Sequence, residues 1–363
     1  MEFSTKIINW YHKNKRELPW RQEVNPYFIW LSEVILQQTR VRQGLPYYLK
    51  FIKNYPSIQE LADSSEENIL KDWQGLGYYS RARNMHAAAK TMVKKHKGKF
   101  PKTYNEILEL EGIGPYTAAA IGSFAFNLPY PVMDGNVQRV IARIFAIEKP
   151  VNSSAGKKMI EEVLKEVFDE KRPGDFNQAI MEFGAMHCKP QQPLCASCPF
   201  NKDCFALKNN LVQLLPLKDK KVKVKTRFFL YIVPQKGKHE FIVKRTEDDI
   251  WKNLYQFPLI EMEEPLIFPD DKMILYILKK EKWKSKFKIK HISHEYKHVL
   301  THRIIYARFV TVEADKDFKP EKNWVKKEVD NQEIFAFPVL ISKYLEEREK
   351  ISKKGGAALT QKL

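Results

Sequence analysis

Two acidic residues, Glu33 and Asp134, stand in surroundings that favour different protonation states. Glu33 lies in the stretch WLSEVILQQTR, whose apolar periodicity predicts a helix, and its helical neighbours include Ile29, Trp30 and Leu36. Because apolar surroundings disfavour a charge, we expect a raised pKa for Glu33. Asp134 precedes the periodic run VQRVIARIF and is predicted to cap that helix, whose N-terminus favours an ionised carboxylate. One protonated and one ionised carboxyl group form the pair that cleavage of a glycosidic bond requires.

All cysteines of the chain lie in one short segment, CKPQQPLCASCPFNKDC, with the spacing C-x6-C-x2-C-x5-C. Such clustering predicts a metal site more strongly than disulfides. Zinc usually takes paired C-x2-C units, whereas this asymmetric spacing suits a compact iron–sulfur cluster with one thiolate on each iron. The predicted ligands are Cys188, Cys195, Cys198 and Cys204.

A glycine-containing turn, LEGIGP, precedes a predicted helix. Gly112 and Gly114 allow the backbone to turn tightly and to direct N–H groups outward, which together with the helix N-terminus forms an anion-binding nest. This pattern is typical of the hairpin in a helix-hairpin-helix element, which binds DNA phosphates. An ordinary connection between two helices is the alternative.

The chain divides by its periodicity into a helical part and a later part rich in alternating, β-type runs. Within the later part, KMILYILKKE predicts a helix. We expect an all-α domain followed by an α+β domain. The predicted boundaries are 1–207 for the helical domain with its cysteine loop at 188–204, 208–225 for a connector, 226–345 for the α+β domain and 346–363 for a flexible tail.

The chain of 363 residues has a net charge of +18, and both parts are basic, with +7 over residues 1–208 and +11 over the remainder. A basic surface on both parts indicates a polyanionic partner such as nucleic acid, although lysine-rich solubility is the alternative. No apolar run reaches the length of a membrane span, and no signal peptide is recognised. We therefore expect a location in the bacterial cytoplasm, with association to the nucleoid through DNA.

Several motifs together resemble those of the adenine DNA glycosylases of the MutY type, within the endonuclease III superfamily. They occur in the family's order, and they are WLSEVILQQTRV, WQGLGYYSRARN, LEGIGPYTAAAI, VMDGNVQRV and FNQAIMEFGAMHC. The resemblance implies a helix-hairpin-helix glycosylase domain in which the cysteines hold a [4Fe–4S] cluster. It also implies that Lys189, in the cysteine loop, contacts phosphate.

The resemblance assigns roles to the acidic pair. Glu33 is expected to protonate adenine N7 and later to activate water, while Asp134 stabilises an oxocarbenium-like sugar or forms a covalent intermediate. Tyr116 and Asn136 are expected to orient Asp134 and the transition state. Superfamily members that also cleave the DNA backbone carry a lysine nucleophile where this chain has Tyr116, which favours a glycosylase without lyase activity.

Further residues are implied to contact the substrate. A base must leave the duplex stack before its glycosidic bond can be reached. The residues implied to hold the flipped adenine are Arg16, Trp20, Gln178 and Glu182. The residues implied to enter the duplex or to approach the opposite base are Gln38, Tyr78 and Thr39. Gln138 replaces a lysine found in some relatives, so the phosphate contact of that lysine is not carried over.

The segment TEDDIWKNLYQFPLIE resembles part of the Nudix-like domain that ends these enzymes. The metal-binding Nudix box is not found between 226 and 345, so this domain is expected to recognise 8-oxoguanine rather than to catalyse. The family's Phe-Ser-His turn corresponds to Leu300, Thr301 and His302, where the leucine replaces an aromatic ring.

The sequence thus predicts a monomeric base-excision-repair enzyme acting on duplex DNA with adenine opposite 8-oxoguanine or guanine. Two alternatives remain open. One is a glycosylase that is also a lyase, and the other is a non-catalytic iron–sulfur protein that binds DNA.

Overall fold

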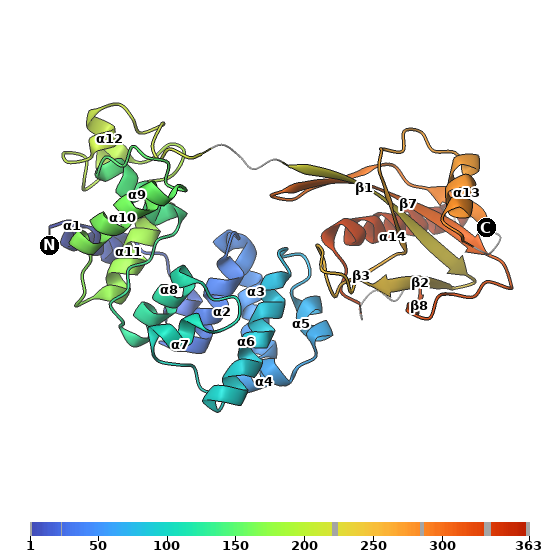
Figure 1. Ribbon diagram of the computed structural model, residues 1–363, viewed down its shortest axis with the longest axis horizontal. Coiled ribbons are helices and arrows are strands. Elements are labelled where there is room, and N and C mark those ends of the chain that lie inside the picture. Colours follow the sequence, from blue (N-terminus) through green and yellow to red (C-terminus); the bar gives the residue numbers. More distant parts are fainter. Residues whose placement is uncertain (1, 23, 220–223, 284–286, 330–334, 361–363) are drawn as a thin grey trace. The chain divides into compact units, whose positions relative to one another are not determined.

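A computed structural model describes residues 2–22, 24–219, 224–283, 287–329 and 335–360 (Figure 1). The chain forms two compact units, one from residues 1–64 and 83–221 and the other from residues 65–82 and 222–363. The first is helical and the second contains a sheet, which confirms the predicted order of an all-α and an α+β part. Residues 220–223 of the predicted connector lie outside the described residues.

The first unit is built from short helices joined by tight turns, and none of the described helices is long and apolar enough to cross a membrane. Its helices are α1 (Glu2–Asn14), η1 (Pro19–Arg21), α2 (Pro26–Leu36), α3 (Val41–Asn54), α4 (Ile58–Asp63), most of α6 (Ser80–His96), α7 (Tyr104–Leu108), α8 (Pro115–Phe126), α9 (Gly135–Ile144), α10 (Ser154–Val167), α11 (Pro173–Met186), η2 (Cys195–Ser197) and α12 (Phe205–Lys208).

An apolar core fixes α9 against α1 and α11. Ile8 of α1, Val137 and Val140 of α9, and Ile180 and Phe183 of α11 are all fully buried in it. Each such side chain contributes about 1.5–3 kcal/mol by leaving water. This packing holds the N-terminal end of α9, and the residue that caps it, next to α11.

The stretch WLSEVILQQTR, which was predicted as one helix, is interrupted. Helix α2 ends at Leu36, Gln38 adopts a left-handed conformation with φ 54°, and α3 starts at Val41. Gly44 of α3 lies so close to α2 that a Cβ there would be 2.8 Å from the Leu36 side chain. Gln38 therefore lies in a turn between two tightly packed helices, and not at the end of a continuing helix.

The second unit contains one mixed sheet in which β1 and β7 run parallel to each other and β2, β4, β5 and β6 pair antiparallel to their neighbours. Its strands are β1 (Lys225–Lys236), β2 (His239–Lys244), β3 (Tyr255–Gln256), β4 (Leu259–Met262), β5 (Phe287–Ile292), β6 (Tyr296–Val299), β7 (Arg303–Ala314) and β8 (Trp324–Glu328). Its helices are α5 (Glu66–Asp72), α13 (Asp271–Lys280) and α14 (Val339–Thr360).

The segment 65–82 groups with the second unit, although the predicted helical domain of residues 1–207 included it. Hydrogen bonds between polar side chains account for this difference. Lys244 donates to Glu67, and Asn253 Nδ2 donates to Glu66 Oε1 at 2.6 Å. Sequence periodicity identifies α5 as a helix but cannot show these long-range partners.

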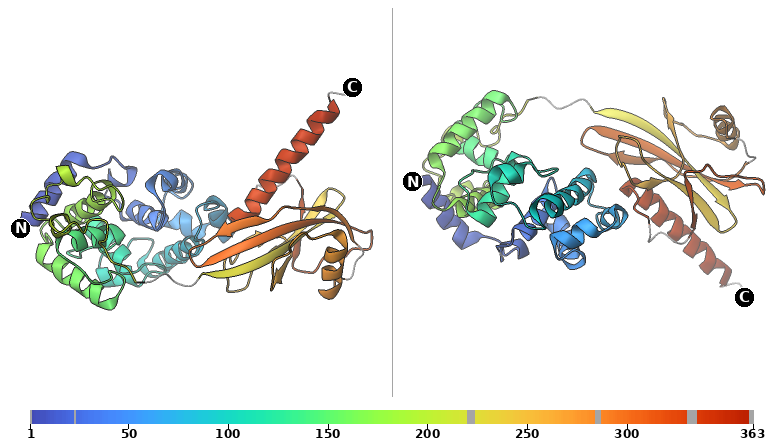
Figure 2. Two further views of the ribbon diagram at one scale, coloured as in Figure 1. Left: turned by 90° about the horizontal axis from the view of Figure 1, so that it is seen from above. Right: turned by 60° about the horizontal axis from the view of Figure 1, so that its bottom comes forward.

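The predicted flexible tail over 346–363 differs from the structure, in which α14 runs to Thr360 (Figure 2). Arg348 donates two hydrogen bonds to Glu240, at 2.7 and 3.0 Å, and Glu240 is fully buried. Because a buried carboxylate requires cationic partners, this ion pair fixes the helix beyond the predicted domain end. Residues 361–363 of the predicted tail lie outside the described residues.

Candidate active site and DNA-contacting elements

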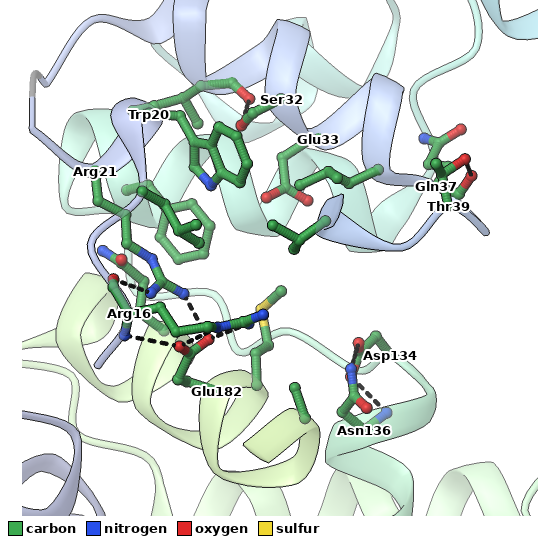
Figure 3. Close-up of a pocket in the computed structure, with 18 of the residues that line it drawn as sticks. Arg16, Trp20, Arg21, Ser32, Glu33, Gln37, Thr39, Asp134, Asn136 and Glu182 are labelled. Carbon is green, nitrogen blue, oxygen red and sulfur yellow. Dashed lines mark hydrogen bonds and ion pairs between the residues drawn. The ribbon is translucent and has the colours of Figure 1, made fainter. Parts of the chain in front are cut away.

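A cavity of about 980 Å³ opens in the first unit, among η1, α2, α8, α11 and the start of α9 (Figure 3). It brings together residues that are far apart in the sequence and were singled out for catalysis or substrate binding. These are Arg16, Trp20, Glu33, Gln38, Thr39, Tyr116, Asp134, Asn136, Gln178 and Glu182.

Glu33 projects from α2 and is only 9% exposed. Burial raises its pKa to about 7, and the neighbouring charge of Asp134 acts in the same direction. The Tyr116 hydroxyl donates to Glu33 Oε2 at 3.0 Å and partly opposes this rise. A raised pKa agrees with the sequence-based expectation, and near neutral pH Glu33 is able both to give up and to take a proton.

Asp134 caps α9 as predicted. Its Oδ1 accepts hydrogen bonds from the backbone N–H groups of Asn136 and Val137, both at 2.8 Å, and its Oδ2 accepts from Asn136 Nδ2 at 2.8 Å. Burial raises the pKa of Asp134, and the hydrogen bonds from Val137 and Asn136 act in the opposite direction by favouring the ionised form.

Tyr116 and Asn136 serve different carboxyl groups. Tyr116 was expected to orient Asp134, but its hydroxyl bonds to Glu33. Asn136 is the side chain that bonds to Asp134, and Arg139 Nη2 donates in turn to Asn136 Oδ1 at 2.9 Å. Each carboxyl group of the pair therefore has a positioning partner of its own.

Arg139 joins this site to the cysteine loop. Its guanidinium donates to Asn136 as above, and its Nε donates to the backbone oxygen of Cys188 at 2.8 Å. Arg139 is 8% exposed and comes from α9. Arg139 thereby connects the start of the cysteine loop, at Cys188, to Asn136, which in turn bonds to Asp134.

Glu182 lies across the cavity from Glu33 and forms ion pairs with two arginines (Figure 3). Arg16 donates to both of its oxygens at 2.7 Å, and Arg21 Nη2 donates to Oε2 at 2.9 Å. Glu182 itself is 1% exposed. Despite burial, these two guanidinium groups lower the pKa of Glu182 to about 2.

Gln178 and Trp20 line the same region. Tyr11 donates to Gln178 Oε1 at 2.8 Å, which leaves the Gln178 amide NH₂ as the group that can still be directed to a ligand. Trp20 meets the ring of Tyr48 edge-on at 5.1 Å between centroids, so it is both a packed side chain and part of the cavity wall.

The glycine turn connects α7 to α8 as predicted. Gly112 has φ 78°, and a Cβ at this position would lie 2.6 Å from the Cβ of Asn84. Gly114 is the N-cap of α8 and is followed by Pro115. Gly112 is therefore required both by its backbone conformation and by its close packing.

The four cysteines line one small hollow and form no disulfide. Two N–H donors are directed at their sulfurs, because Arg143 Nη1 lies 3.4 Å from Cys188 Sγ and the backbone nitrogen of Phe200 lies 3.4 Å from Cys198 Sγ. Within the described ranges, no three His, Cys, Asp or Glu side chains meet the geometry of a metal site. Lys189 is half-exposed in the loop, and its carbonyl accepts from Arg143 at 2.7 Å.

The second unit places Leu300, Thr301 and His302 at the tip of the hairpin that joins β6 and β7. Thr301 and His302 are exposed, and Leu300 is half-buried. The hydroxyl of Tyr78, in the segment of the second unit that follows α5, forms a hydrogen bond with that of Thr301. Tyr78 is thus brought to the predicted recognition turn, whereas Gln38 belongs to the first unit.

Some cavity-lining residues were not singled out from the sequence. They include Arg21, Arg40 and Arg42. Arg40 ends the motif WLSEVILQQTR and Arg42 follows it by two residues, so the basic residues at this end of the motif could have indicated both. Arg21 differs, because its place opposite Glu182 depends on packing between η1 and α11.

Comparisons with known proteins agree with this architecture. Residues 31–170 match the HhH-GPD superfamily of base excision DNA repair proteins, and residues 229–347 match the NUDIX domain. The chain is 35% identical to the adenine DNA glycosylase of Buchnera aphidicola subsp. Baizongia pistaciae, over 96% of this chain and 97% of that one. It is 38% identical to the enzyme of the same name from Buchnera aphidicola subsp. Acyrthosiphon pisum, over 75% of this chain and 78% of that one.

Solved structures resemble the helical part. A thermostable thymine-DNA glycosylase matches with a TM-score of 0.53 and 28% identity, over 57% of this chain and 96% of that one. Endonuclease III in a trapped covalent DNA intermediate shares the fold, with a TM-score of 0.50 and 23% identity, over 57% of this chain and 95% of that one. Taken with the two-domain match and the nearly full-length relative, these likenesses show that the chain belongs to the adenine DNA glycosylase family.

Proposed function

We propose that this chain hydrolyses the N-glycosyl bond of adenine paired with 8-oxoguanine or guanine in duplex DNA, acting as a monomer. The carrying observation is that Glu33, with a pKa near 7, and Asp134 line one cavity. Glu33 protonates adenine N7 and then helps to activate water, and Asp134 stabilises the positively charged sugar or bonds to it covalently. Each role requires a carboxyl group facing the flipped nucleotide, which their shared cavity provides.

Tyr116 supports hydrolysis without strand cleavage. Burial and the nearby carboxyl groups raise the pKa of its hydroxyl well above the usual range, so it remains a hydrogen-bond donor to Glu33. A lyase requires an amine nucleophile, and the phenol cannot form a Schiff base. Tyr116 therefore acts by orienting Glu33, and Asn136 by orienting Asp134.

The cavity wall opposite Glu33 is assigned to adenine. Trp20 offers an aromatic surface, and Gln178 and the Arg16–Glu182 pair offer donors and acceptors at fixed positions. Because a pre-formed hydrogen-bonding wall rejects bases with a different pattern, these groups would favour adenine. Glu182 is held by its arginines and serves mainly to fix Arg16.

The surrounding elements are assigned to the DNA backbone and to the opposite base. The turn at Gly112 and Gly114 and the loop residue Lys189 contact phosphates. Gln38 and Tyr78 enter the duplex, and Thr39 approaches the opposite base. The residues that distinguish 8-oxoguanine are Leu300, Thr301 and His302.

The four cysteines are assigned to a [4Fe–4S] cluster. Four thiols that share one hollow would supply the ligands of such a cluster, and the N–H groups directed at two of the sulfurs would supply hydrogen bonds to them. The bound cluster would stabilise the loop 188–204, through which Lys189 is presented. Iron and sulfide analysis of protein purified without oxygen tests this assignment.

One duplex panel tests the proposal as a whole. Adenine release should be fast opposite 8-oxoguanine, slower opposite guanine, and weak opposite cytosine or thymine, with an abasic product and no rapid strand scission. Glu33→Gln should slow release by about 100-fold or more, because it removes the general acid. Unchanged release in that variant would disprove the role of Glu33, and a borohydride-trapped adduct would indicate a lyase instead.

A further inference from the structure

The hairpin tip proposed to recognise 8-oxoguanine is fixed at its backbone on two sides. Leu300 N–H donates to the Arg303 carbonyl at 2.8 Å, which closes the turn. On the other side, Lys225 N–H of β1 donates to the His302 carbonyl at 3.0 Å. Both bonds hold the main chain, and the one that closes the turn is made to Arg303, the first residue of β7.

The Arg303 side chain is held by one carboxylate, that of Asp249. Arg303 Nη1 donates to Asp249 Oδ1 at 2.8 Å. Asp249 Oδ2 accepts from Arg227 Nη1 at 2.6 Å and from Arg245 Nη2 at 3.0 Å. Three guanidinium groups therefore converge on a side chain that is only 20% exposed.

Asp249 belongs to a segment that is itself closed by hydrogen bonds. Arg245 N–H donates to the Leu254 carbonyl at 2.9 Å, and Asn253 N–H donates to the Arg245 carbonyl at 2.6 Å. The ring of Trp251, which is 9% exposed, lies 5.7 Å from that of His298 on β6. The segment 245–254 thus contacts the hairpin both at β6 and, through Asp249, at β7.

We propose that Asp249 is a positioning residue that sets the preference between 8-oxoguanine and guanine opposite adenine, by fixing Arg303 and with it the tip at Thr301 and His302. This inference rests on the proposed function. A recognition group displaced by a fraction of an ångström loses directed hydrogen bonds, so preference depends on rigid support. Without Asp249 the three guanidinium groups repel one another, and Arg303 loses the carboxylate that holds its side chain.

The test compares Asp249→Ala with a matched control, Glu261→Ala. Glu261 accepts two hydrogen bonds from Arg227, both at 2.6 Å, and none of the described bonds joins it to Arg303. Adenine release is measured under single-turnover conditions on duplexes with 8-oxoguanine or guanine opposite adenine. We expect Asp249→Ala to lower the ratio of the two rates by about tenfold, the scale of one charged hydrogen bond. Glu261→Ala should leave the ratio within about twofold of wild type, because the bond between Asp249 and Arg303 stays in place.

A second variant keeps the test decisive if Asp249→Ala folds poorly. Arg303→Met leaves the bonds of Asp249 to Arg227 and Arg245 in place and should lower the ratio by a similar factor. The double variant should lose no more than either single variant, since both remove the same contact.

Equal losses on both duplexes would show a merely structural role and would overturn the inference. An unchanged ratio in Asp249→Ala and Arg303→Met would overturn it as well, while leaving the proposed function intact. A wild-type chain with no preference for 8-oxoguanine would instead overturn the proposed function and this inference together.

Discussion

At the scale of single residues, Glu33 is surrounded so that it holds a proton near neutral pH. Apolar burial supplies the main effect, and the charge of Asp134 adds to it. The Tyr116 hydroxyl, which remains a donor, limits the rise by favouring the ionised form. The balance leaves Glu33 able to act first as an acid and then as a base, as removal of a base by hydrolysis requires.

The rate of adenine release should therefore fall as pH rises above about 7, because the protonated fraction of Glu33 declines. Single-turnover rates measured from pH 5 to 9 would show this, provided that DNA is saturating at each pH. Glu33→Gln should lose this dependence along with most of its activity. A wild-type rate that increases through this range would contradict the role of Glu33 as the acid.

The same raised pKa predicts a change in stability. The folded-state value of about 7 exceeds the ordinary 4.5, so the stabilisation gained from the proton is present below pH 4.5 and is lost as pH rises through 7. Between pH 5 and 8 the free energy of unfolding should fall more for the wild type than for Glu33→Gln. Urea unfolding at both pH values measures the difference, and parallel curves would exclude the raised pKa.

Glu182 has the opposite electrostatic situation, with a pKa lowered to about 2 by Arg16 and Arg21. Glu182→Gln leaves both guanidinium groups without a counter-charge and should lower the free energy of unfolding by about 2 kcal/mol. This loss is smaller than that expected for a fully buried ion pair, because Arg16 is partly exposed. Glu2→Gln, which removes the exposed pair with Lys6, is the matched control and should leave the unfolding curve close to that of the wild type. Equal losses, measured by urea unfolding at pH 7, would contradict this account.

Among the elements, helix α11 both lines the cavity and bonds to the segment that precedes α9. Gln178 and Glu182 face the cavity from α11, while Asn177 of the same helix is fully buried. Asn177 accepts from the Val132 N–H at 3.0 Å and donates to the Tyr130 carbonyl at 2.8 Å. One helix therefore supplies the cavity wall and also supports the segment that leads to Asp134.

Asn177→Ala should loosen this segment and slow adenine release by about tenfold, since misplacing a catalytic group by an ångström has large effects. Hydrogen exchange at the Val132 amide should become faster, because its acceptor is removed. Asn105→Ala, at an exposed position of α7, is the control. Unchanged exchange at Val132 would show that Asn177 does not hold the segment.

The sequence allowed the helices and the ten cavity residues named above to be predicted, because both depend on local periodicity and on motifs. The end of α2 at Leu36 was missed, because the left-handed conformation of Gln38 and the close packing of Gly44 cannot be seen in the apolar pattern. The partner of Tyr116 and the place of Arg21 were missed because both depend on contacts between elements distant in the sequence. The helical continuation at Arg348 likewise depends on a buried carboxylate from β2.

At the scale of the whole molecule, positive charge is distributed over both parts of the chain, with +7 through residue 208 and +11 beyond it. The boundary between the compact units does not follow that division, because the segment 65–82 belongs with the C-terminal part. Tyr78 lies in this segment and bonds to Thr301. Each unit therefore carries basic residues of its own.

Affinity for undamaged duplex DNA should therefore fall steeply with salt. If about five phosphates are neutralised, the logarithm of the binding constant should decrease with the logarithm of salt concentration with a slope near −4 to −5. Fluorescence anisotropy with one labelled duplex between about 50 and 300 mM salt would measure the slope. Near the upper end of this range, salt strongly screens the attraction between exposed charges. Arg40→Gln together with Arg42→Gln, at the rim of the cavity, should reduce the slope by up to about 2, because each phosphate contact contributes about 1. A slope near zero for the wild type would show that the basic residues do not face the DNA. An unchanged slope in the double variant would show that residues other than Arg40 and Arg42 make the phosphate contacts.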